Sequence, residues 1–346
     1  MDHLKNTHIL VTGGGAPGAV GIIKALNRAG YHNISCSDVN KKVAGSILAN
    51  DSFQLPYGTD PDYTDILLKE CKTRDIDLIL PITTKELLAV SRIKSKLADV
   101  GCNTVVSPIE SLKISNDKGA LYTHLKDSGI TVPKHRIVQN IEEFENALEA
   151  FDQGEAFTFK PCVSNGSRGF RIIDPSIDEF DLWLNQKPNN AYVTKEEALS
   201  ILKKGPMPPL LFSEYLEGEE YSVDCLIHKG EIKLIIPRKR ININNGISVE
   251  GLIENNKTVI DYCTQILESL ELDGPIGIQV KYKGNQPLIL EINPRLQGSS
   301  TSCIGAGINL PQLAIENALG KQPNKTQNDI KWGTHFVRHY EEIYYK

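Results

Sequence analysis

The sequence contains no apolar run that approaches the roughly 20 residues needed to span a bilayer as a helix. Its 7 cysteines are scattered singly, without a CxxC pair, which is typical of free thiols in a reducing compartment. Positive charge is not in excess, because 38 Lys and Arg stand against 43 Asp and Glu, for a net charge of -5. That balance disfavours binding to nucleic acid or to a membrane surface through a basic face. Since the amino terminus also lacks a signal-like apolar segment, we expect a cytoplasmic protein.

The 346 residues, of which 40% are hydrophobic, are enough for two or three domains with ordinary cores. In the amino-terminal part, short apolar runs alternate with stretches of helical periodicity. We expect strands at residues 8–11, 33–37, 77–82 and 104–107, and a first helix at residues 19–29. Strands separated by helices favour a parallel sheet with helices on both faces. This pattern predicts an α/β domain at about residues 1–111.

The remaining sequence mixes helices with strands of antiparallel character. Alternating apolar residues on both sides of Gly230 are typical of a hairpin, and the polar stretch 185–209 indicates an exposed connection. We expect helices at residues 118–126, 141–151, 257–270 and 310–319, and strands at residues 135–138, 156–160, 170–173, 219–227, 231–237, 276–282, 286–292 and 334–339.

A glycine-rich turn follows the first expected strand. Gly13, Gly15 and Gly18 match the spacing G-x-G-x-x-G, and Asp38 follows at the end of the next strand. Glycines at such a turn let a phosphate approach the backbone at a helix N-terminus, as in dinucleotide-binding domains. The motif therefore predicts an NAD(P)-dependent oxidoreductase or epimerase. A tight turn that needs glycine only for packing is the alternative.

Three polar side chains alternate with apolar ones near the end of a later strand. Glu291, Asn293 and Arg295 occupy every second position, so they share one face of the strand, and Gln279 lies on the preceding strand. The oxygen atoms of Gln279, Glu291 and Asn293 suit Mg²⁺, and the guanidinium of Arg295 suits a phosphoryl group. A structural ion pair is the alternative. Three polar side chains facing a core are costly unless paired, which favours a functional site.

A lysine ends another apolar strand. Lys160 precedes a loop rich in serine and glycine, residues 164–169, whose backbone N–H groups could surround phosphate oxygens. An exposed lysine at a strand end is the common alternative, and for Lys160 taken alone it is the favoured one.

These residues occur together with other motifs in a fixed order. The order is Asn116-Asp117-Lys118, Lys160-Pro161 before the glycine loop, residues 213–218 and 220–224, then Gln279 and residues 291–295. Over about residues 112–320 the chain resembles the ATP-grasp superfamily, and within it the carbamoyl-phosphate-synthase-like carboxylate–amine ligases. Because the chain has one such unit and no glutaminase region, carbamoyl phosphate synthesis itself is not expected.

The resemblance implies an architecture. An α/β N-terminal domain with a parallel, Rossmann-like sheet (the pre-ATP-grasp domain), residues 1–111, would precede a two-lobed α+β ATP-grasp module. The first lobe, residues 112–213, would carry the mobile glycine loop. The second lobe, residues 214–346, would carry the metal and phosphate site. The glycine turn at residues 13–18 would then belong to a substrate-side domain and need bind no nucleotide.

The resemblance also implies roles for matching residues. Arg295 and Lys160 would be catalytic, and Arg295 would stabilise the transferred phosphoryl group and the acyl phosphate. The residues that would bind ATP are Lys118, Lys160, Ser164, Gly166, Ser167, Gly169, Glu214, Tyr215, Leu216 and Glu220. Residues 214–216 would read the adenine edge, and Glu220 would hold the ribose. Those that would bind Mg²⁺, or Mn²⁺ in its place, are Gln279, Glu291 and Asn293.

The implied reaction is that of an ADP-forming ligase. ATP phosphorylates a substrate carboxylate, an amine attacks the acyl phosphate, and an amide or peptide-like bond forms. For the small-molecule substrates, the candidates are Arg238 and Arg240, which share a strand face, and Ser299, although a basic run is equally typical of a solvated edge. The sequence identifies neither the carboxylate nor the amine. An exposed sheet edge in the N-terminal domain would support a homodimer.

Overall fold

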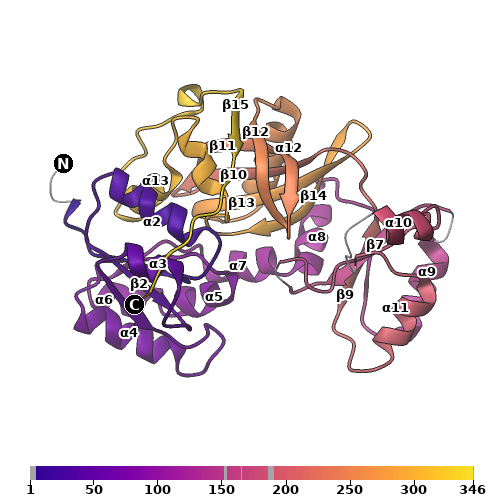
Figure 1. Cartoon of the computed structure of the whole chain (residues 1–346), viewed down its shortest axis with the longest axis horizontal. Coiled ribbons are helices and arrows are strands. Elements are labelled where there is room, and N and C mark those ends of the chain that lie inside the picture. Colours follow the sequence, from indigo (N-terminus) through magenta and orange to yellow (C-terminus); the bar gives the residue numbers. More distant parts are fainter. Residues whose placement is uncertain (1–4, 152–153, 165, 186–190, 346) are drawn as a thin grey trace. The chain divides into compact units, whose positions relative to one another are not determined.

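The structure is a computed structural model that describes residues 5–151, 154–164, 166–185 and 191–345 (Figure 1). The chain forms two compact units, each made of segments that are distant in the sequence. The first unit consists of Met1–Asn116, Glu219–Val280 and Glu291–Lys346, and the second of Asp117–Gly218 and Lys281–Leu290. The division into domains at residues 1–111, 112–213 and 214–346 stays a prediction.

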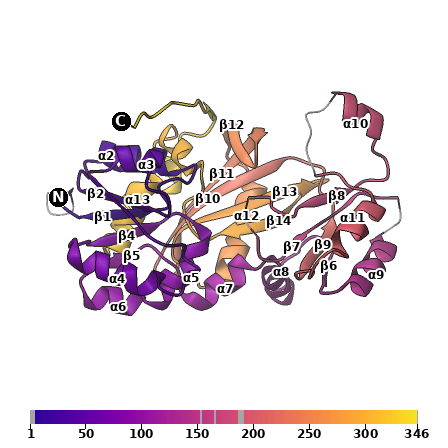
Figure 2. The ribbon, with the colours of Figure 1, turned by 60° about the horizontal axis from the view of Figure 1, so that its bottom comes forward.

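A parallel sheet with helices on both faces begins the first unit. Its strands are β1 (Ile9–Thr12), β2 (Ile34–Asp38), β3 (Asp51–Gln54), β4 (Leu78–Pro81) and β5 (Asn103–Thr104), in the order β3-β2-β1-β4-β5. Its helices are α2 (Ala19–Arg28), α3 (Ala44–Leu48), α4 (Tyr63–Thr73), α5 (Thr84–Arg92), α6 (Lys94–Asp99) and α7 (Ile109–Asn116). Ile9 and Val11 pack with α2, and Leu10 packs with α4, α5 and α6 on the opposite face (Figure 2). Burial on both faces explains why β1 is a continuous apolar run rather than an alternating one.

A six-stranded sheet also belongs mainly to the first unit. Its strands are β10 (Glu220–His228), β11 (Glu231–Asn244), β12 (Ile247–Ile253), β13 (Gly274–Lys283), β14 (Gln286–Asn293) and β15 (Thr334–Val337), in the order β14-β13-β10-β11-β12-β15. With it come α12 (Lys257–Glu268), α13 (Leu310–Ala318) and the short 3₁₀ turns η1 (Ser300–Ile304) and η2 (Gln327–Asp329). Leu234 and Ile236 of β11 join the core that β1 and α2 form. The same face of β11 continues into Arg238 and Arg240, so it changes from apolar to charged along the strand.

The second unit contains a four-stranded antiparallel sheet. Its strands are β6 (His135–Val138), β7 (Phe157–Pro161), β8 (Arg171–Ile173) and β9 (Leu210–Glu214), in the order β6-β9-β7-β8, and its helices are α8 (Lys118–Asp127), α9 (Ile141–Phe151), α10 (Glu179–Asn185) and α11 (Lys195–Leu202). Phe212 of β9 lies at the centre of its core and contacts four other phenylalanine rings, those of Phe144, Phe151, Phe157 and Phe159. Strand β7, which ends in Lys160, is held in this core by Phe157 and Phe159.

Most expected elements are present, and three differ from the sequence-based expectation. The connection expected at residues 185–209, of which 186–190 lie outside the described residues, contains α11, because Thr194 and Glu197 form a capping box. Strand β11 extends to Asn244 rather than ending at residue 237, since Arg238 and Arg240 pair with β12. Ladder pairing of β5 ends at Thr104 instead of residue 107. Within the described ranges, no helix has the length and apolar character needed to cross a membrane.

Phe212→Ala tests the core of the second unit. Because four rings lose a partner at once, we expect the free energy of unfolding to fall by about 3–5 kcal/mol. Chemical denaturation followed by circular dichroism measures this loss. Phe180→Ala is the matched control, since Phe180 is 68% exposed, and it should change stability little. Equal losses in both variants would contradict this description of the core.

Candidate active site

The end of β14 presents a chain of hydrogen-bonded polar groups. Asn293 Nδ2 donates to Glu291 Oε1 (3.1 Å), and Arg295 Nη2 donates to Asn293 Oδ1 (3.2 Å). The apolar neighbours Ile292 and Pro294 are buried, whereas the three polar side chains are only partly buried. The alternation read from the sequence therefore exists in the folded chain. Gln279 lies on β13, the strand next to β14 in the sheet.

Arg295 is held from two further directions. Its Nε donates to Thr84 Oγ1 at the start of α5 (3.0 Å), and its Nη1 donates to the carbonyl of Leu296 (2.8 Å). Burial lowers the pKa of Arg295 below that of an ordinary guanidinium, while the negative charges of Glu291 and Glu86 act in the opposite direction. A desolvated guanidinium in a fixed orientation is suited to stabilise negative charge that develops nearby.

The loop after Arg295 is fixed by a buried carboxylate. Asp224 of β10 accepts hydrogen bonds from Ser300 Oγ (2.6 Å), Gln297 Nε2 (3.2 Å) and Arg238 Nε (2.5 Å). Arg238 in turn donates to Ser299 Oγ through Nη1 (3.0 Å). Ser299 is therefore an acceptor for Arg238 in this structure, and its hydroxyl proton is available to another acceptor.

Room for this loop comes from a glycine. A Cβ on Gly277 would lie 2.2 Å from Cγ of Gln297, so no larger residue fits beside that side chain. Gly277 therefore allows Gln297 to reach Asp224.

The glycine turn near the amino terminus is braced from within the chain. Asp38 accepts hydrogen bonds from the backbone N–H of Gly15 (2.9 Å) and of Asn40 (2.9 Å). Gly13 has a positive φ of 71°, and a Cβ there would lie 2.3 Å from Thr83 Cγ2. A Cβ on Gly18 would lie 3.1 Å from the Cα of Gly298. The glycines therefore allow close packing of the turn against its neighbours, and the carboxylate oxygens of Asp38 accept hydrogen bonds from backbone N–H groups within the turn and next to it.

Two lysines of the second unit lie near each other. Lys118 is buried at the start of α8, and its Nζ donates to the carbonyl of Ser164 (2.9 Å). Lys160 at the end of β7 donates to the carbonyl of Leu290 (3.1 Å). Cys162 lies beside Lys118, whose backbone N–H donates to the carbonyl of Cys162 (2.9 Å). Two ammonium groups placed close together are suited to bind phosphate oxygens.

The loop that follows Lys160 contains residues with left-handed backbone. Gly166, Ser167 and Gly169 have φ values of 63°, 59° and 76°. A Cβ on Gly169 would lie 2.6 Å from Cδ of Pro161, so glycine is required where the loop returns to β7. Asn165 lies outside the described residues. Successive turns of this kind direct backbone N–H groups outward, as in an anion-binding nest.

The segment after β9 is tied to the hairpin between β13 and β14. Glu214 forms an ion pair with Lys283, and its Oε1 accepts from the backbone N–H of Lys134 (2.6 Å). The ring of Tyr215 lies 4.7 Å from Lys281 Nζ. Leu216 is buried, and Gly218 N–H donates to the carbonyl of Tyr282 (2.9 Å). Residues 214–218 therefore have a fixed backbone, as a segment that reads an adenine edge would need.

Glu220 forms an ion pair with Arg240, whose side chain is only 5% exposed. The expected ribose-binding carboxylate is thus oriented by one of the two arginines expected at the substrate. Arg240 also donates to Ser248 Oγ (3.0 Å) and to the carbonyl of Gly246 (2.7 Å).

Four residues near these groups had no role in the sequence-based prediction: Thr84, Asp224, Gln297 and Arg338. Thr84 and Arg338 make their contacts across 211 and 321 residues of sequence, so periodicity gives no signal for them. Asp224 lies at the end of the motif at residues 220–224, and Gln297 lies two residues after the motif at residues 291–295. Both are buried beside other polar residues.

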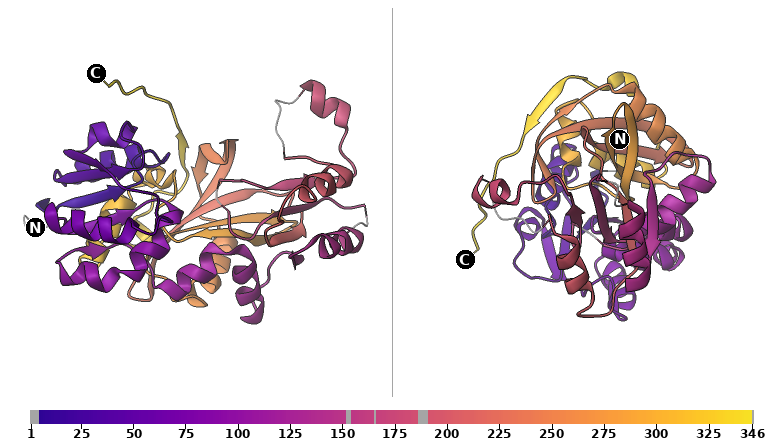
Figure 3. Two further views of the ribbon diagram at one scale, coloured as in Figure 1. Left: turned by 90° about the horizontal axis from the view of Figure 1, so that it is seen from below. Right: turned by 90° about the vertical axis from the view of Figure 1, so that its right-hand side faces the viewer.

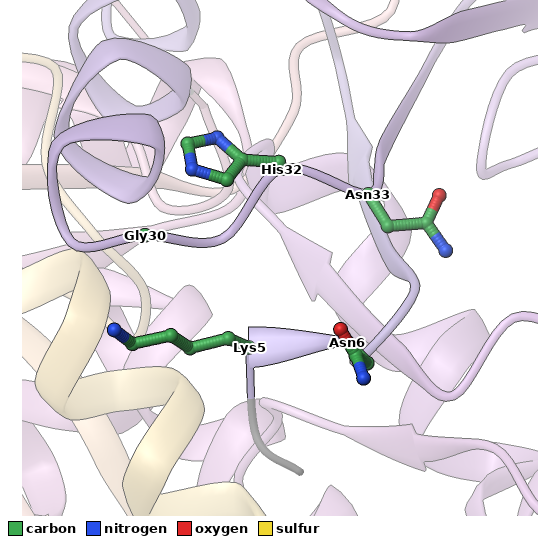
Figure 4. A pocket seen from close by; sticks show the side chains of 5 residues that line it. All are labelled: Lys5, Asn6, Gly30, His32 and Asn33. Atoms are coloured by element: carbon green, nitrogen blue, oxygen red, sulfur yellow. The ribbon is translucent and has the colours of Figure 1, made fainter. Parts of the chain in front are cut away.

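A separate cavity lies at the opposite end of the parallel sheet. It measures about 650 Å³ and is lined by Lys5, Asn6, Gly30, His32 and Asn33, which precede β1 and β2 (Figure 4). Ligands of open parallel sheets bind outside the carboxyl ends of the strands, whereas this cavity lies at the amino ends. It is therefore a surface recess away from the candidate active site.

Two family models match the chain. Residues 206–337 match a model described as ATP-grasp in the biosynthetic pathway with Ter operon, and residues 9–106 match the PylC-like N-terminal domain. These matches place an ATP-grasp domain at residues 206–337 and a PylC-like N-terminal domain at residues 9–106. Both the superfamily and the fold class expected from the sequence are confirmed.

Relatives of known sequence agree with this assignment. The large chain of carbamoyl phosphate synthase from Thermoanaerobacter pseudethanolicus is 25% identical over 309 residues, which are 86% of this chain and 27% of that protein. An uncharacterised protein of Methanocaldococcus jannaschii is 25% identical over 219 residues, 61% of this chain and 48% of that protein. The chain therefore spans about a quarter to a half of the length of these relatives.

Solved structures share the fold at low sequence identity. N5-carboxyaminoimidazole ribonucleotide synthetase in complex with ADP has a TM-score of 0.71, with 15% identity over 93% of this chain and 79% of that one. The biotin carboxylase domain of the Hydrogenobacter thermophilus 2-oxoglutarate carboxylase has a TM-score of 0.70, with 14% identity over 95% and 73%. The L-amino acid ligase of Bacillus licheniformis has a TM-score of 0.64, with 14% identity over 91% and 74%.

Cys162 lies beside the two lysines and is expected to be inert. Burial, with a further contribution from the charge of Asp117, raises the pKa of its thiol to about 11, so it stays protonated near neutral pH. All seven cysteines are buried. Ellman's reagent should therefore react slowly with the native protein and with seven thiols after denaturation. Rapid labelling of Cys162 in the native state, located by mass spectrometry, would contradict this.

Proposed function

We propose that the protein is an ATP-dependent ligase that activates a substrate carboxylate as an acyl phosphate and transfers it to an amine. The observation that carries the proposal is the hydrogen-bonded series Glu291–Asn293–Arg295 at the end of β14. It combines a carboxylate, a carboxamide and a desolvated guanidinium in one direction. Such a set supports phosphoryl transfer, in which neutralising charge and positioning the groups account for most of the rate.

Oxygen donors of the first unit fit a divalent cation. Gln279, Glu291 and Asn293 would hold Mg²⁺, with Mn²⁺ as the alternative, and the cation would supply charge neutralisation on the phosphate oxygens of ATP. Within the described residues, no group of three His, Cys, Asp or Glu side chains forms a metal site of its own. A single carboxylate with two carboxamides binds a cation weakly, so the nucleotide would complete its coordination.

In the second unit we propose that Lys118 and Lys160 bind the phosphates of ATP. Lys118 is buried and Lys160 is partly buried, so water screens their charges less and their attraction for phosphate oxygens is stronger. Ser164, Gly166, Ser167 and Gly169 would add backbone N–H groups. Glu214, Tyr215 and Leu216 would contact the adenine, and Glu220, oriented by Arg240, would accept from the ribose hydroxyls.

The oxidoreductase alternative is supported less well. A dinucleotide-binding turn leaves its N–H groups to the pyrophosphate and its acidic residue to the ribose. Here the N–H of Gly15 donates to Asp38, so the backbone of the turn and the acidic side chain are bonded to each other. The alternative also leaves Arg295 and its bonds to Thr84 and Asn293 without a purpose.

The reaction that follows has two steps. The carboxylate oxygen attacks the γ-phosphorus, ADP leaves, and Arg295 stabilises the charge on the transferred group. An amine then attacks the acyl carbon, phosphate leaves, and the amine loses a proton. Excluding water matters because an acyl phosphate would otherwise hydrolyse. The biotin carboxylase domain named above is described as a dimer, and a homodimer of this chain stays a prediction.

Nucleotide binding is tested by thermal unfolding with MgADP, MgATP, NAD and NADP. A ligand at 100 times its dissociation constant adds about 2.7 kcal/mol, which should raise the midpoint by several degrees for MgADP and MgATP. Lys160→Ala should lose most of that rise. Lys203→Ala is the control in the same unit, since Lys203 pairs with Glu145 at the surface. A rise with NAD or NADP alone would overturn the proposal in favour of the oxidoreductase.

Turnover is tested by ADP release in a screen of carboxylate and amine pairs. Glu291→Ala and Arg295→Ala should each lower kcat by about 10²–10³, the usual effect of removing one preorganised stabilising group. Glu250→Ala, on β12 and paired with His335 at the surface, is the matched control and should retain activity. Normal turnover in both site variants would refute the assignment of the series on β14.

A further inference from the structure

One guanidinium nitrogen is buried without a partner in the first unit. Arg238 has no exposed surface, and its Nε and Nη1 are bonded to Asp224 and Ser299. Its Nη2 finds no hydrogen-bond acceptor in the part of the chain that the structure describes. A buried charged donor left unsatisfied is costly, and the neighbouring thiol of Cys303 is only a weak acceptor, so the position calls for an acceptor that is not part of the chain.

A second arginine lies nearby with no carboxylate to balance it. Arg338 directly follows β15; its Nη2 donates to the carbonyl of Pro17 (3.2 Å), and its backbone N–H donates to the carbonyl of Val249 (2.7 Å). Among the described residues, no Asp or Glu forms an ion pair with it. Burial lowers the pKa of Arg338, and the like charge of Arg238 lowers it further. Two like charges with only one counter-ion, Asp224, between them are destabilising unless an anion binds.

The strand register brings both arginines to one face of the six-stranded sheet. Arg240, Gly251 and Phe336 are paired across β11, β12 and β15. The side chains of Arg240 and Phe336 therefore lie on the face that also carries Arg238 and, two residues after Phe336, Arg338. A Cβ on Gly251 would lie 2.7 Å from the ring of Phe336, so glycine makes room for that ring. The ring lies 6.0 Å from the guanidinium of Arg238. Val337, on the opposite face, is 70% exposed.

Each arginine is bonded to a different loop of the candidate active site. Arg338 holds the glycine turn through Pro17, and Arg238 holds the loop after Arg295 through Ser299. These two loops meet where Gly18 approaches Gly298. An anion bound by both arginines would therefore sit beside the group that the proposed reaction uses to stabilise the transferred phosphoryl.

We propose that Arg238 and Arg338 form a subsite for a second, non-reacting anionic group of the substrate, a carboxylate or a phosphate. Asp224 balances one of the two positive charges, which leaves one charge and the free Nη2 for one anion. The substrate is then a molecule with two anionic groups, one activated and one recognised. Only the activated group rests on the proposed function.

Inorganic phosphate is the probe, compared with chloride at equal ionic strength by thermal unfolding of the full chain, with and without MgADP. The wild type should gain stability in phosphate, and Arg338→Gln should lose most of that gain. In chloride, Arg338→Gln should unfold at the same temperature as the wild type or higher, because a like-charge repulsion is removed. Lys239→Gln, on the other face of β11 and paired with Glu219, is the matched control and should keep the full gain.

Three results would overturn the subsite. The first is no gain in stability for the wild type beyond that in chloride. The second is an equal gain in Arg338→Gln. The third is a loss of stability of Arg338→Gln in chloride while its gain in phosphate stays intact, which would mean that Arg338 only supports the turn at Pro17. A missing response to MgADP in the wild type would instead contradict the proposed function and leave the phosphate result to be judged by itself. The two failures are therefore distinguishable.

Discussion

The buried carboxylate of Asp224 is the constraint on which the candidate active site depends. It accepts from a strand arginine, Arg238, and from two residues of the loop that follows Arg295, Gln297 and Ser300. Removing one partner of a buried pair costs about 3–5 kcal/mol, yet replacing the whole pair with apolar residues is often neutral or stabilising. Stability alone therefore does not explain such a pair. The ion pair instead orients the surrounding side chains, because every group that is bonded to Asp224 is held in one position.

The glycine turn at the amino terminus illustrates how one motif can serve two purposes. In a dinucleotide-binding domain the turn leaves its N–H groups open, and the acidic residue after the second strand reaches the ribose. In this chain Asp38 bonds to the turn, and Gly18 lies against Gly298. The spacing of glycines is the same because both purposes need close approach of backbone. Only the partner of Asp38 distinguishes them, and a sequence does not report a partner.

The sequence predicts contacts that lie along one strand better than contacts between distant strands. Glu291, Asn293 and Arg295 were predicted as one set because a strand repeats every two residues, and their bonds follow that repeat. The parallel sheet was predictable because short, continuous apolar runs alternate with stretches of helical periodicity. The pairing of Arg240 with Glu220 depends on the register of a hairpin, and Arg338 meets Arg238 only through the order of β11, β12 and β15. Helix α11 was missed because the polar stretch that contains it has a proline before the helix, Pro188, and Gly205-Pro206 after it, which are typical of a connection.

The two arginines expected at the substrate differ in what their contacts leave available. Arg240 donates to Glu220, Ser248 and Gly246, so its guanidinium is occupied and its role is to orient Glu220. Arg238 is more deeply buried and yet retains an unsatisfied nitrogen. Burial usually argues against substrate contact, since a buried polar group is normally satisfied by its own protein. A buried polar group without a partner argues in the opposite direction. Folding has already removed water from it, so an anion that binds there does not have to displace water and forms a strong charge-assisted hydrogen bond.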